Sequence, residues 1–221
     1  LEVLSSGVTE SLIASLSHLP RLRVFAHETA LRYGAAEPRA AGHAMGAGTV
    51  LSGEMRRSNG ALVIGVELVE VEGGERIWSA QYACPLSALP AAQAEIATSV
   101  AGALRLKMTS EERLRLTRRY TENTDAYNLY LKGRYFWNKY AAKWVKKGIE
   151  YFQQAIELDQ SYALAYAGVA DCYFRLSAVH LPPQEALPKA SAAAHKAVEM
   201  DDSLAEAHAS LAMIKFWYDH D

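Results

Sequence analysis

The apolar residues in the first part of the chain recur at helical spacing and then alternate. The helical pattern fits a helix that begins at Ser5 or Ser6 and ends before Pro20, because serine is a favoured N-cap and proline cannot continue a helix. The alternation over residues 21–26 predicts a strand, and residues 38–45 predict a second helix. The apolar stripe of the first helix consists of Val8, Leu12, Leu16 and Leu19.

Three strand-like runs follow, separated by turn signals. Asn59 and Gly60 form the strongest short signal for a β-hairpin, and Gly73 with Gly74 marks the next turn. Because apolar and polar residues alternate in these runs, each is expected to bury one face. The runs cover residues 49–57, 61–71 and 75–83.

A long helix, predicted over residues 89–108, completes the first part of the chain. The order is helix, strand, helix, three-stranded meander and helix, which predicts an α+β domain with a mostly antiparallel sheet covered by helices. We therefore expect this domain at residues 1–108, a linker at residues 109–122 and a second domain at residues 123–221.

The second domain repeats part of its own sequence. Residues 161–170 align with residues 203–212, and residues 155–159 align with residues 197–201 at the same offset of 42. Self-similarity at such a period indicates stacked supersecondary units. The pattern predicts an all-α domain of about two and a half helical pairs. An irregular helical bundle is the alternative.

Large and small residues follow a fixed order within one predicted pair. They are Tyr166, Val169, Ala170 and Tyr173 in its first helix, and Ala190, Ala194 and Ala197 in its second helix. This order resembles the tetratricopeptide repeat, whose usual period is about 34 residues. We expect the additional residues in a loop over residues 178–188, because Pro182 and Pro183 favour a break there.

Four segments together resemble a known bacterial arrangement. They are residues 6–13, 51–57, 77–82 and 130–135. The first three resemble the TolB amino-terminal-like domain, and the fourth resembles its junction with tetratricopeptide repeats. Such regions occur in CadC-like transcriptional regulators and beside adenylate cyclase and protein kinase domains. The resemblance implies a sensing or interaction module in signal transduction. Members of that family begin with a strand, which would precede Leu1, and the DNA-binding domain of the regulators has no counterpart in this sequence.

The sequence contains no catalytic or metal-binding motif. The net charge of −2 gives no basis for direct binding of nucleic acid. There is no phosphate-binding loop, dinucleotide fingerprint or nucleophile elbow, and the seven histidines lack the spacing of a helical metal site. Cys84 and Cys172 form no motif and are interpreted as small apolar residues. We predict no catalytic residue, no metal ligand and no cofactor.

No apolar run in the sequence is long enough to span a bilayer, so no membrane segment is predicted in this fragment. The sequence is compatible with more than one cellular compartment. The resemblance allows the bacterial cytoplasm as well as the periplasmic face of a membrane-anchored regulator.

In tetratricopeptide arrays the first helices of successive pairs line a concave face that binds a protein or peptide. By position, this face would contain Tyr130, Arg134, Trp137, Asn138, Ala167, Asp171, Phe174, Arg175, Met213, Phe216 and Trp217. Packing of these aromatic residues between helices is the alternative. The apolar residues of the incomplete third pair also predict a homodimer.

Charge is unevenly distributed along the second part of the chain. Residues 109–150 contain ten Lys or Arg and five Asp or Glu, whereas residues 151–221 contain four and ten. This asymmetry is typical of a groove that orients a charged partner, or simply of a solvated surface.

Three functional hypotheses follow. The first is a non-enzymatic sensor and protein-binding module of a bacterial regulator. The second is the regulatory region of a signalling enzyme such as an adenylate cyclase or a protein kinase. The third is a small-ligand sensor that uses a cleft between the two domains.

Overall fold

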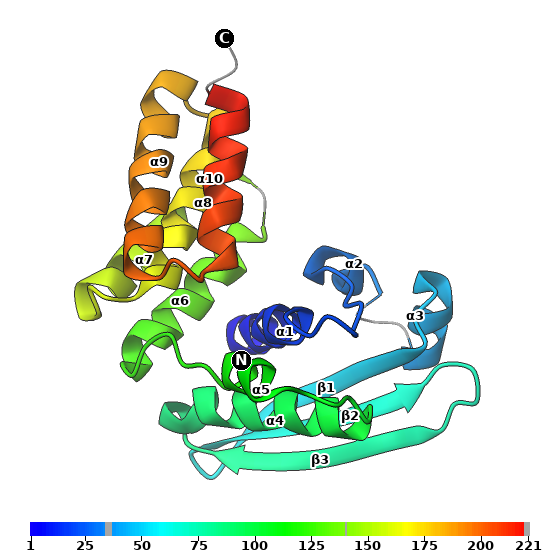
Figure 1. The fold of residues 1–221 in the computed structure, drawn as a ribbon. Helices are drawn as coiled ribbons and strands as arrows, with labels where there is room; N and C mark the ends of the chain where they lie inside the picture. Colours follow the sequence, from blue (N-terminus) through cyan, green and yellow to red (C-terminus); the bar gives the residue numbers. More distant parts are fainter. Residues whose placement is uncertain (34–36, 140, 219–221) are drawn as a thin grey trace. The chain divides into compact units, whose positions relative to one another are not determined.

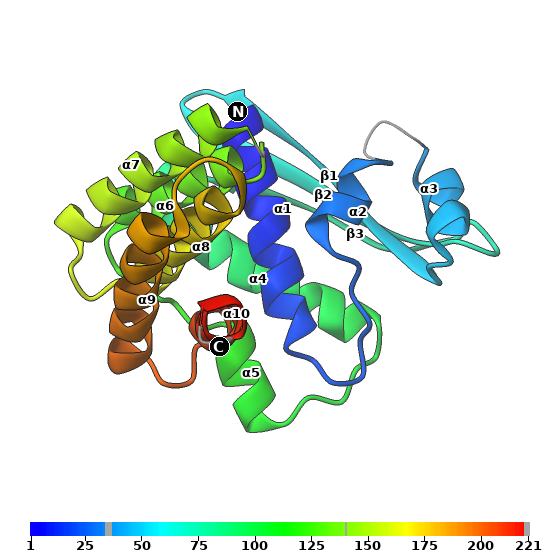
Figure 2. The same ribbon diagram turned by 90° about the horizontal axis from the view of Figure 1, so that it is seen from above.

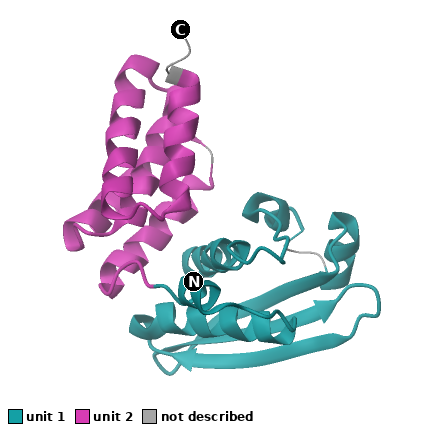
Figure 3. Cartoon of the chain, viewed as in Figure 1, with its two compact units in different colours: residues 1–118 teal, residues 119–221 magenta. Residues whose placement is uncertain are grey.

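The computed structural model describes residues 1–33, 37–139 and 141–218. The chain divides into two compact units, residues 1–118 and 119–221 (Figure 3). The boundary lies inside the interval predicted as a linker. In the described residues, both helices and one antiparallel sheet are present, so the chain is of mixed α and β structure.

Unit 1 contains five helices, a short 3₁₀ turn and three strands in its described residues (Figure 1). Their bounds are α1 (Glu2–Ser17), α2 (His27–Leu31), α3 (Pro38–Met45), β1 (Thr49–Ser58), β2 (Ala61–Glu70), β3 (Arg76–Cys84), η1 (Leu86–Ala88), α4 (Leu89–Ala103) and α5 (Ser110–Leu116).

The three strands form an antiparallel meander in the order β1-β2-β3, and the prediction of three such strands is confirmed. The hairpin between β1 and β2 turns at Asn59 and Gly60, both with positive φ, as the Asn-Gly signal requires. Leu62, Ile64 and Leu68 are buried on one face of β2. Helix α4 packs on β3, where the Tyr82 hydroxyl lies 3.4 Å from the Ser99 hydroxyl.

Helix α3 confirms its predicted bounds and lies at the end of the sheet where β1 begins (Figure 2). Gly46 ends the helix in the left-handed conformation, with φ 66°. Gly42 faces Val71 and Val50 so closely that a Cβ at this position would overlap both side chains. A glycine therefore lets α3 approach the sheet.

Two local predictions in unit 1 were wrong. Residues 21–26 form neither a strand nor a helix, because no neighbouring strand in the described chain pairs with them. Helix α1 begins at Glu2 rather than after Ser5 or Ser6, and Leu1 is its N-cap. The Ser5 amide instead donates to the Leu1 carbonyl within the first turn of the helix.

The interval predicted as a linker holds a helix and a shorter connection. Helix α5 begins after Thr109, whose side chain accepts a hydrogen bond from the Glu112 amide while the Glu112 carboxylate accepts one from the Thr109 amide. This capping box explains why a short helix forms here. Helix α5 packs on α1 and α4 and so belongs to unit 1.

Unit 2 contains only helices in its described residues. They are α6 (Thr124–Trp137), α7 (Ala142–Leu158), α8 (Ala163–Val179), α9 (Pro183–Met200) and α10 (Ala205–Tyr218). Each helix packs against the next, and α10 also packs against α8.

The repeat in the sequence is repeated in the hydrogen bonds of unit 2. Asp159 follows α7, and its carboxylate accepts bonds from the Ser161 amide at 2.9 Å and the Ser161 hydroxyl at 2.6 Å. Asp201 follows α9 and accepts the equivalent bonds from Ser203 at 3.1 Å and 2.7 Å. The two turns thus have the same chemistry and lead into α8 and α10, respectively.

The predicted loop over residues 178–188 was wrong. Helix α8 continues to Val179, and α9 begins at Pro183. Pro183 occupies the first turn of α9, where a missing N–H costs little, and Pro188 lies inside the helix. The additional residues of this repeat therefore lengthen its helices rather than its loop.

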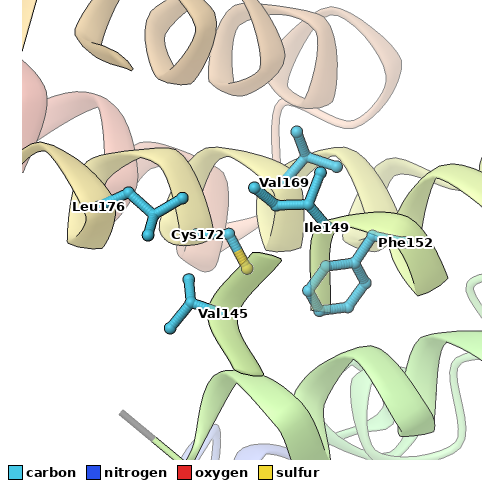
Figure 4. Packing of buried hydrophobic residues seen from close by; sticks show 6 residues of the cluster. All are labelled: Val145, Ile149, Phe152, Val169, Cys172 and Leu176. Atoms are coloured by element: carbon cyan, nitrogen blue, oxygen red, sulfur yellow. The ribbon is translucent and has the colours of Figure 1, made fainter. Parts of the chain in front are cut away.

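Phe152 belongs to a buried cluster of unit 2 that also contains Val145, Ile149, Val169, Cys172 and Leu176 (Figure 4). Its side chain is fully buried and lies between two glycines. A Cβ placed on Gly133 of α6 would lie 2.5 Å from the Phe152 ring, and a Cβ on Gly168 of α8 would lie 2.6 Å from it. The two glycines let α6 and α8 close on both sides of this ring.

Candidate interaction site

Four of the predicted site residues meet in one cluster on α6 and α8, which we call the clamp: Arg134, Trp137, Asp171 and Arg175. The Arg134 guanidinium donates to the Asp171 carboxylate at 3.2 Å. The Arg175 guanidinium donates to the Trp137 carbonyl at 2.7 Å. Both guanidinium groups lie over the Trp137 ring, at 4.4 Å and 3.8 Å from its centre.

A fifth residue, Ser210, extends the clamp to α10. Its hydroxyl donates to the second Asp171 carboxylate oxygen at 2.6 Å. Asp171 therefore connects three helices: α6 through Arg134, α8 through its own backbone and α10 through Ser210. Sequence reasoning missed Ser210, because only the packing of α10 on α8 brings it to Asp171.

Asp171 is an ionisable group partly shielded from water. Its side chain is 24% exposed, and that of Arg134 is 16% exposed. Burial raises the pKa of Asp171 above its ordinary value, although Arg134 and the Ser210 hydrogen bond act in the opposite direction. The clamp is thus a partly desolvated charge cluster, in which an anionic group of a ligand would compete with Asp171 for the arginines.

The structure places three other predicted site residues in packing or capping positions. The Tyr130 ring lies 5.6 Å from that of Phe152 and 5.3 Å from that of Tyr162. Phe174 packs on a buried cluster formed by α8, α9 and α10. The Asn138 amide ends α6 by donating to the Arg134 carbonyl at 3.1 Å. Contacts within unit 2 thus account for the positions of Tyr130 and Phe174.

The predicted site residues on α10 are exposed. Met213 is 48% exposed, Phe216 is 60% exposed and Trp217 is 66% exposed. Met213 and Trp217 follow Ser210 at spacings of three and seven, so they lie on the same side of α10 as the residue that joins the clamp. We call these three residues the α10 apolar face.

A second cluster on α6 and α7 was not predicted as a site. The Phe136 ring stacks between Trp144 and Tyr151, each at a centroid distance of 5.4 Å. Lysine ammonium groups lie over the outer rings of this stack; they belong to Lys132, Lys139, Lys143 and Lys147. The excess of basic residues in residues 109–150 was the signal for it. The cluster makes this surface of unit 2 positive.

The described residues contain no group of three or more His, Cys, Asp or Glu side chains placed to hold a metal ion. Cys84 and Cys172 are both buried and both free. Burial raises the pKa of each thiol, most strongly that of Cys172 in the core of unit 2. None of the helices in the described chain is both long and apolar enough to cross a membrane.

Comparison with known proteins gives one distant relative and no family. No family model matches the chain. The sequence is 25% identical over 217 residues to a protein of Rhizobium meliloti (strain 1021) named "Putative adenylate cyclase 3". The similar region covers 96% of this chain and 37% of that protein. The similarity therefore extends over both units, and the chain spans well under half the length of the relative.

Proposed function

We propose that this chain is a regulatory, protein-binding segment of a bacterial signalling protein. In this proposal unit 2 is a tetratricopeptide-like array that binds a partner segment across α6, α8 and α10. The observation that carries the proposal is the α10 apolar face, because three large apolar side chains stand in solvent on the helix that completes the clamp. The repeated Asp-x-Ser turns support the repeat character of the array.

The charges of unit 2 define the kind of partner. The clamp supplies two arginines beside Trp137, and the α10 apolar face supplies Met213 and Trp217. A segment that combines a carboxylate with neighbouring apolar side chains would match both features. This proposal assigns no reaction to the chain.

A second candidate is the regulatory region of an adenylate cyclase or a similar signalling enzyme. It is favoured by the relative named as an adenylate cyclase, of which this chain resembles 37%. The two candidates share the same chemistry for unit 2. They differ in whether the bound segment belongs to a separate protein or to a catalytic domain of the same polypeptide.

The proposal predicts that substitutions on α10 remove a partner without unfolding the chain. Chain 1–221 and the double variant Phe216→Ser, Trp217→Ser would be used to capture proteins from a bacterial lysate, with quantitative mass spectrometry of the bound fraction. Leu114→Ser is the matched control, because Leu114 is also an exposed apolar residue, 71% exposed, but lies on α5.

At least one protein should bind the unchanged chain and the Leu114 variant and be lost with the α10 variant. Its direct affinity for the purified chain should fall at least tenfold in the α10 variant, with unchanged circular dichroism. Identical bound fractions for all three proteins would overturn the proposal.

A further inference from the structure

The lysines of α6 and α7 form a positive surface that the proposed partner site does not use. Residues 131–149, which include the end of α6 and the start of α7, contain five lysines, one arginine and no Asp or Glu. In the whole chain, by contrast, 23 Lys or Arg stand against 25 Asp or Glu. Arg134 belongs to the clamp, so the lysines give this surface its charge.

Aromatic rings hold four of these lysines in one layer, which we call the lysine layer. Helices α6 and α7 pack side by side, so lysines from both helices share one surface (Figure 1). Trp144 and Tyr151 are seven residues apart on α7, so the charges extend over about 10 Å. The ammonium nitrogens lie 4.8–5.6 Å from the ring centres, with Lys139 and Lys143 over Trp144 and Lys132 and Lys147 over Tyr151.

The charges of the lysine layer reach solvent and are only partly neutralised. Lys139 and Lys143 are exposed, and the Lys147 side chain is 44% exposed. The Glu150 carboxylate pairs with the Lys147 ammonium group at 2.9 Å and offsets one of the charges. Like charges held close together repel each other, and an anionic surface against them relieves this repulsion. The lysine layer is therefore complementary to a broad anionic surface.

The choice of lysine indicates what kind of anion fits. An ammonium group is a compact charge with rotatable donors, whereas a guanidinium group matches one carboxylate or phosphate in a fixed geometry. In the clamp, Arg134 binds one defined carboxylate, that of Asp171. The lysine layer instead suits many anionic groups that have no fixed arrangement, as in the headgroup layer of a phospholipid bilayer.

The aromatic residues of the layer also favour a bilayer surface. Trp and Tyr are enriched where a membrane meets water, because their rings are apolar and carry one polar group. Trp144 and Tyr151 are half-buried, so a part of each ring is accessible beside the lysines. Charge and amphipathic rings thus lie together on one surface.

A single-stranded nucleic acid matches this surface less well. Such a strand stacks its bases on open aromatic faces. Phe136 has Trp144 and Tyr151 stacked on it, each at 5.4 Å, and lysine ammonium groups lie over these two outer rings. A base would therefore have to displace a lysine before it could stack here.

We propose that the lysine layer of α6 and α7 binds the surface of an anionic phospholipid bilayer. The ammonium groups contact headgroup phosphates, and the accessible parts of Trp144 and Tyr151 lie at the level of the headgroups. The contact is peripheral and requires no change of the fold. It does not depend on partner binding by the clamp and the α10 apolar face.

The test mixes purified chain 1–221 with vesicles of phosphatidylglycerol and phosphatidylcholine in equal parts, and with vesicles of phosphatidylcholine alone. Sedimentation at low salt should show at least ten times more chain bound to the anionic vesicles, and high salt should release it. Replacing the four lysines of the layer with glutamine should lower the partition coefficient at least tenfold. These substitutions are Lys132→Gln, Lys139→Gln, Lys143→Gln and Lys147→Gln.

The chain offers a matched control with the same net charge, because four other lysines lie outside residues 131–149. The control substitutions are Lys107→Gln, Lys189→Gln, Lys196→Gln and Lys215→Gln. This variant should bind anionic vesicles as the unchanged chain does. Replacing the four lysines of the layer with arginine keeps their charge and should preserve binding.

A footprint on the unchanged chain avoids any effect of substitution on folding. Anionic vesicles should slow the acetylation of Lys139 and Lys143 at least threefold and leave that of Lys189 and Lys196 unchanged. Equal binding to both kinds of vesicle, binding to neither, or equal loss in both glutamine variants would overturn the proposal. Binding of polyglutamate or of oligothymidylate that requires the lysine layer, without vesicle binding, would overturn it in favour of an acidic protein segment or a nucleic acid, respectively.

Discussion

Replacing Phe152 with alanine is expected to cost unit 2 about 3–5 kcal/mol of its free energy of unfolding. The ring is fully buried, and two glycines hold α6 and α8 against it. Neither helix can move into the cavity that the missing ring leaves without large repacking. A loss of this size approaches the whole stability of many domains. Thermal unfolding followed by tryptophan fluorescence should show a decrease in Tm of roughly 12 °C or more.

The control and a companion variant make this prediction specific. Phe216→Ala removes the same side chain from an exposed position and should change the free energy of unfolding by no more than about 0.5 kcal/mol. Gly168→Ala should cost about 1–3 kcal/mol through overpacking. In the Phe152→Leu background, the free-energy cost of Gly168→Ala should be smaller, because leucine leaves room for the additional methyl group. Additive costs in the double variant would contradict the packing of Gly168 on Phe152.

The second large effect is expected at Asp171. Asp171→Ala removes the bonds that Asp171 accepts from Arg134 and Ser210, and so separates α6, α8 and α10 at one point. Loss of bonds to a charged, largely buried group should cost about 2–3 kcal/mol in urea unfolding. Ser210→Ala removes one of them and should cost about 1 kcal/mol.

The hydrogen bonds that Asp171 accepts predict an order among its variants. Burial disfavours the charged form of Asp171, so an uncharged side chain is compatible with this position, and asparagine also keeps an oxygen that accepts hydrogen bonds. Asp171→Asn should therefore be more stable than Asp171→Ala at pH 7. Glu185→Ala is the control, since the exposed pair of Glu185 with Lys189 contributes little. If the asparagine variant is as unstable as the alanine variant, the hydrogen bonds accepted at position 171 do not contribute to the stability of unit 2.

Local signals in the sequence were enough to predict the three strands of the sheet but not the structure of residues 21–26. Asn59-Gly60 and the alternation on either side fix the hairpin, because turn chemistry and face burial act over a few residues. Residues 21–26 have the same alternation and yet form no strand, since pairing depends on a neighbour that local sequence does not specify.

The repeats of unit 2 were visible because each copy has the same turn and the same small residues. The length of α9 was not visible, because Pro182 and Pro183 suggested a loop. The helix tolerates Pro188, since its buried face of Ala186, Ala190 and Ala194 packs on α8. Arg134 and Asp171 were predicted to lie on the same face, and they form a pair in the clamp. The contact of Asp171 with Ser210 was not predicted, because it depends on how α10 packs.

The most direct test of partner binding by unit 2 is photo-crosslinking in the full-length protein inside bacterial cells. Phe216 would be replaced with p-benzoylphenylalanine, with Leu114 replaced in the same way as the control. We expect the probe at Phe216 to form a crosslink to one defined segment of another protein, or of a catalytic domain of the same polypeptide, that contains acidic and apolar residues. A crosslink only to an adjoining helix that covers α10, or the same products from both probes, would contradict partner binding.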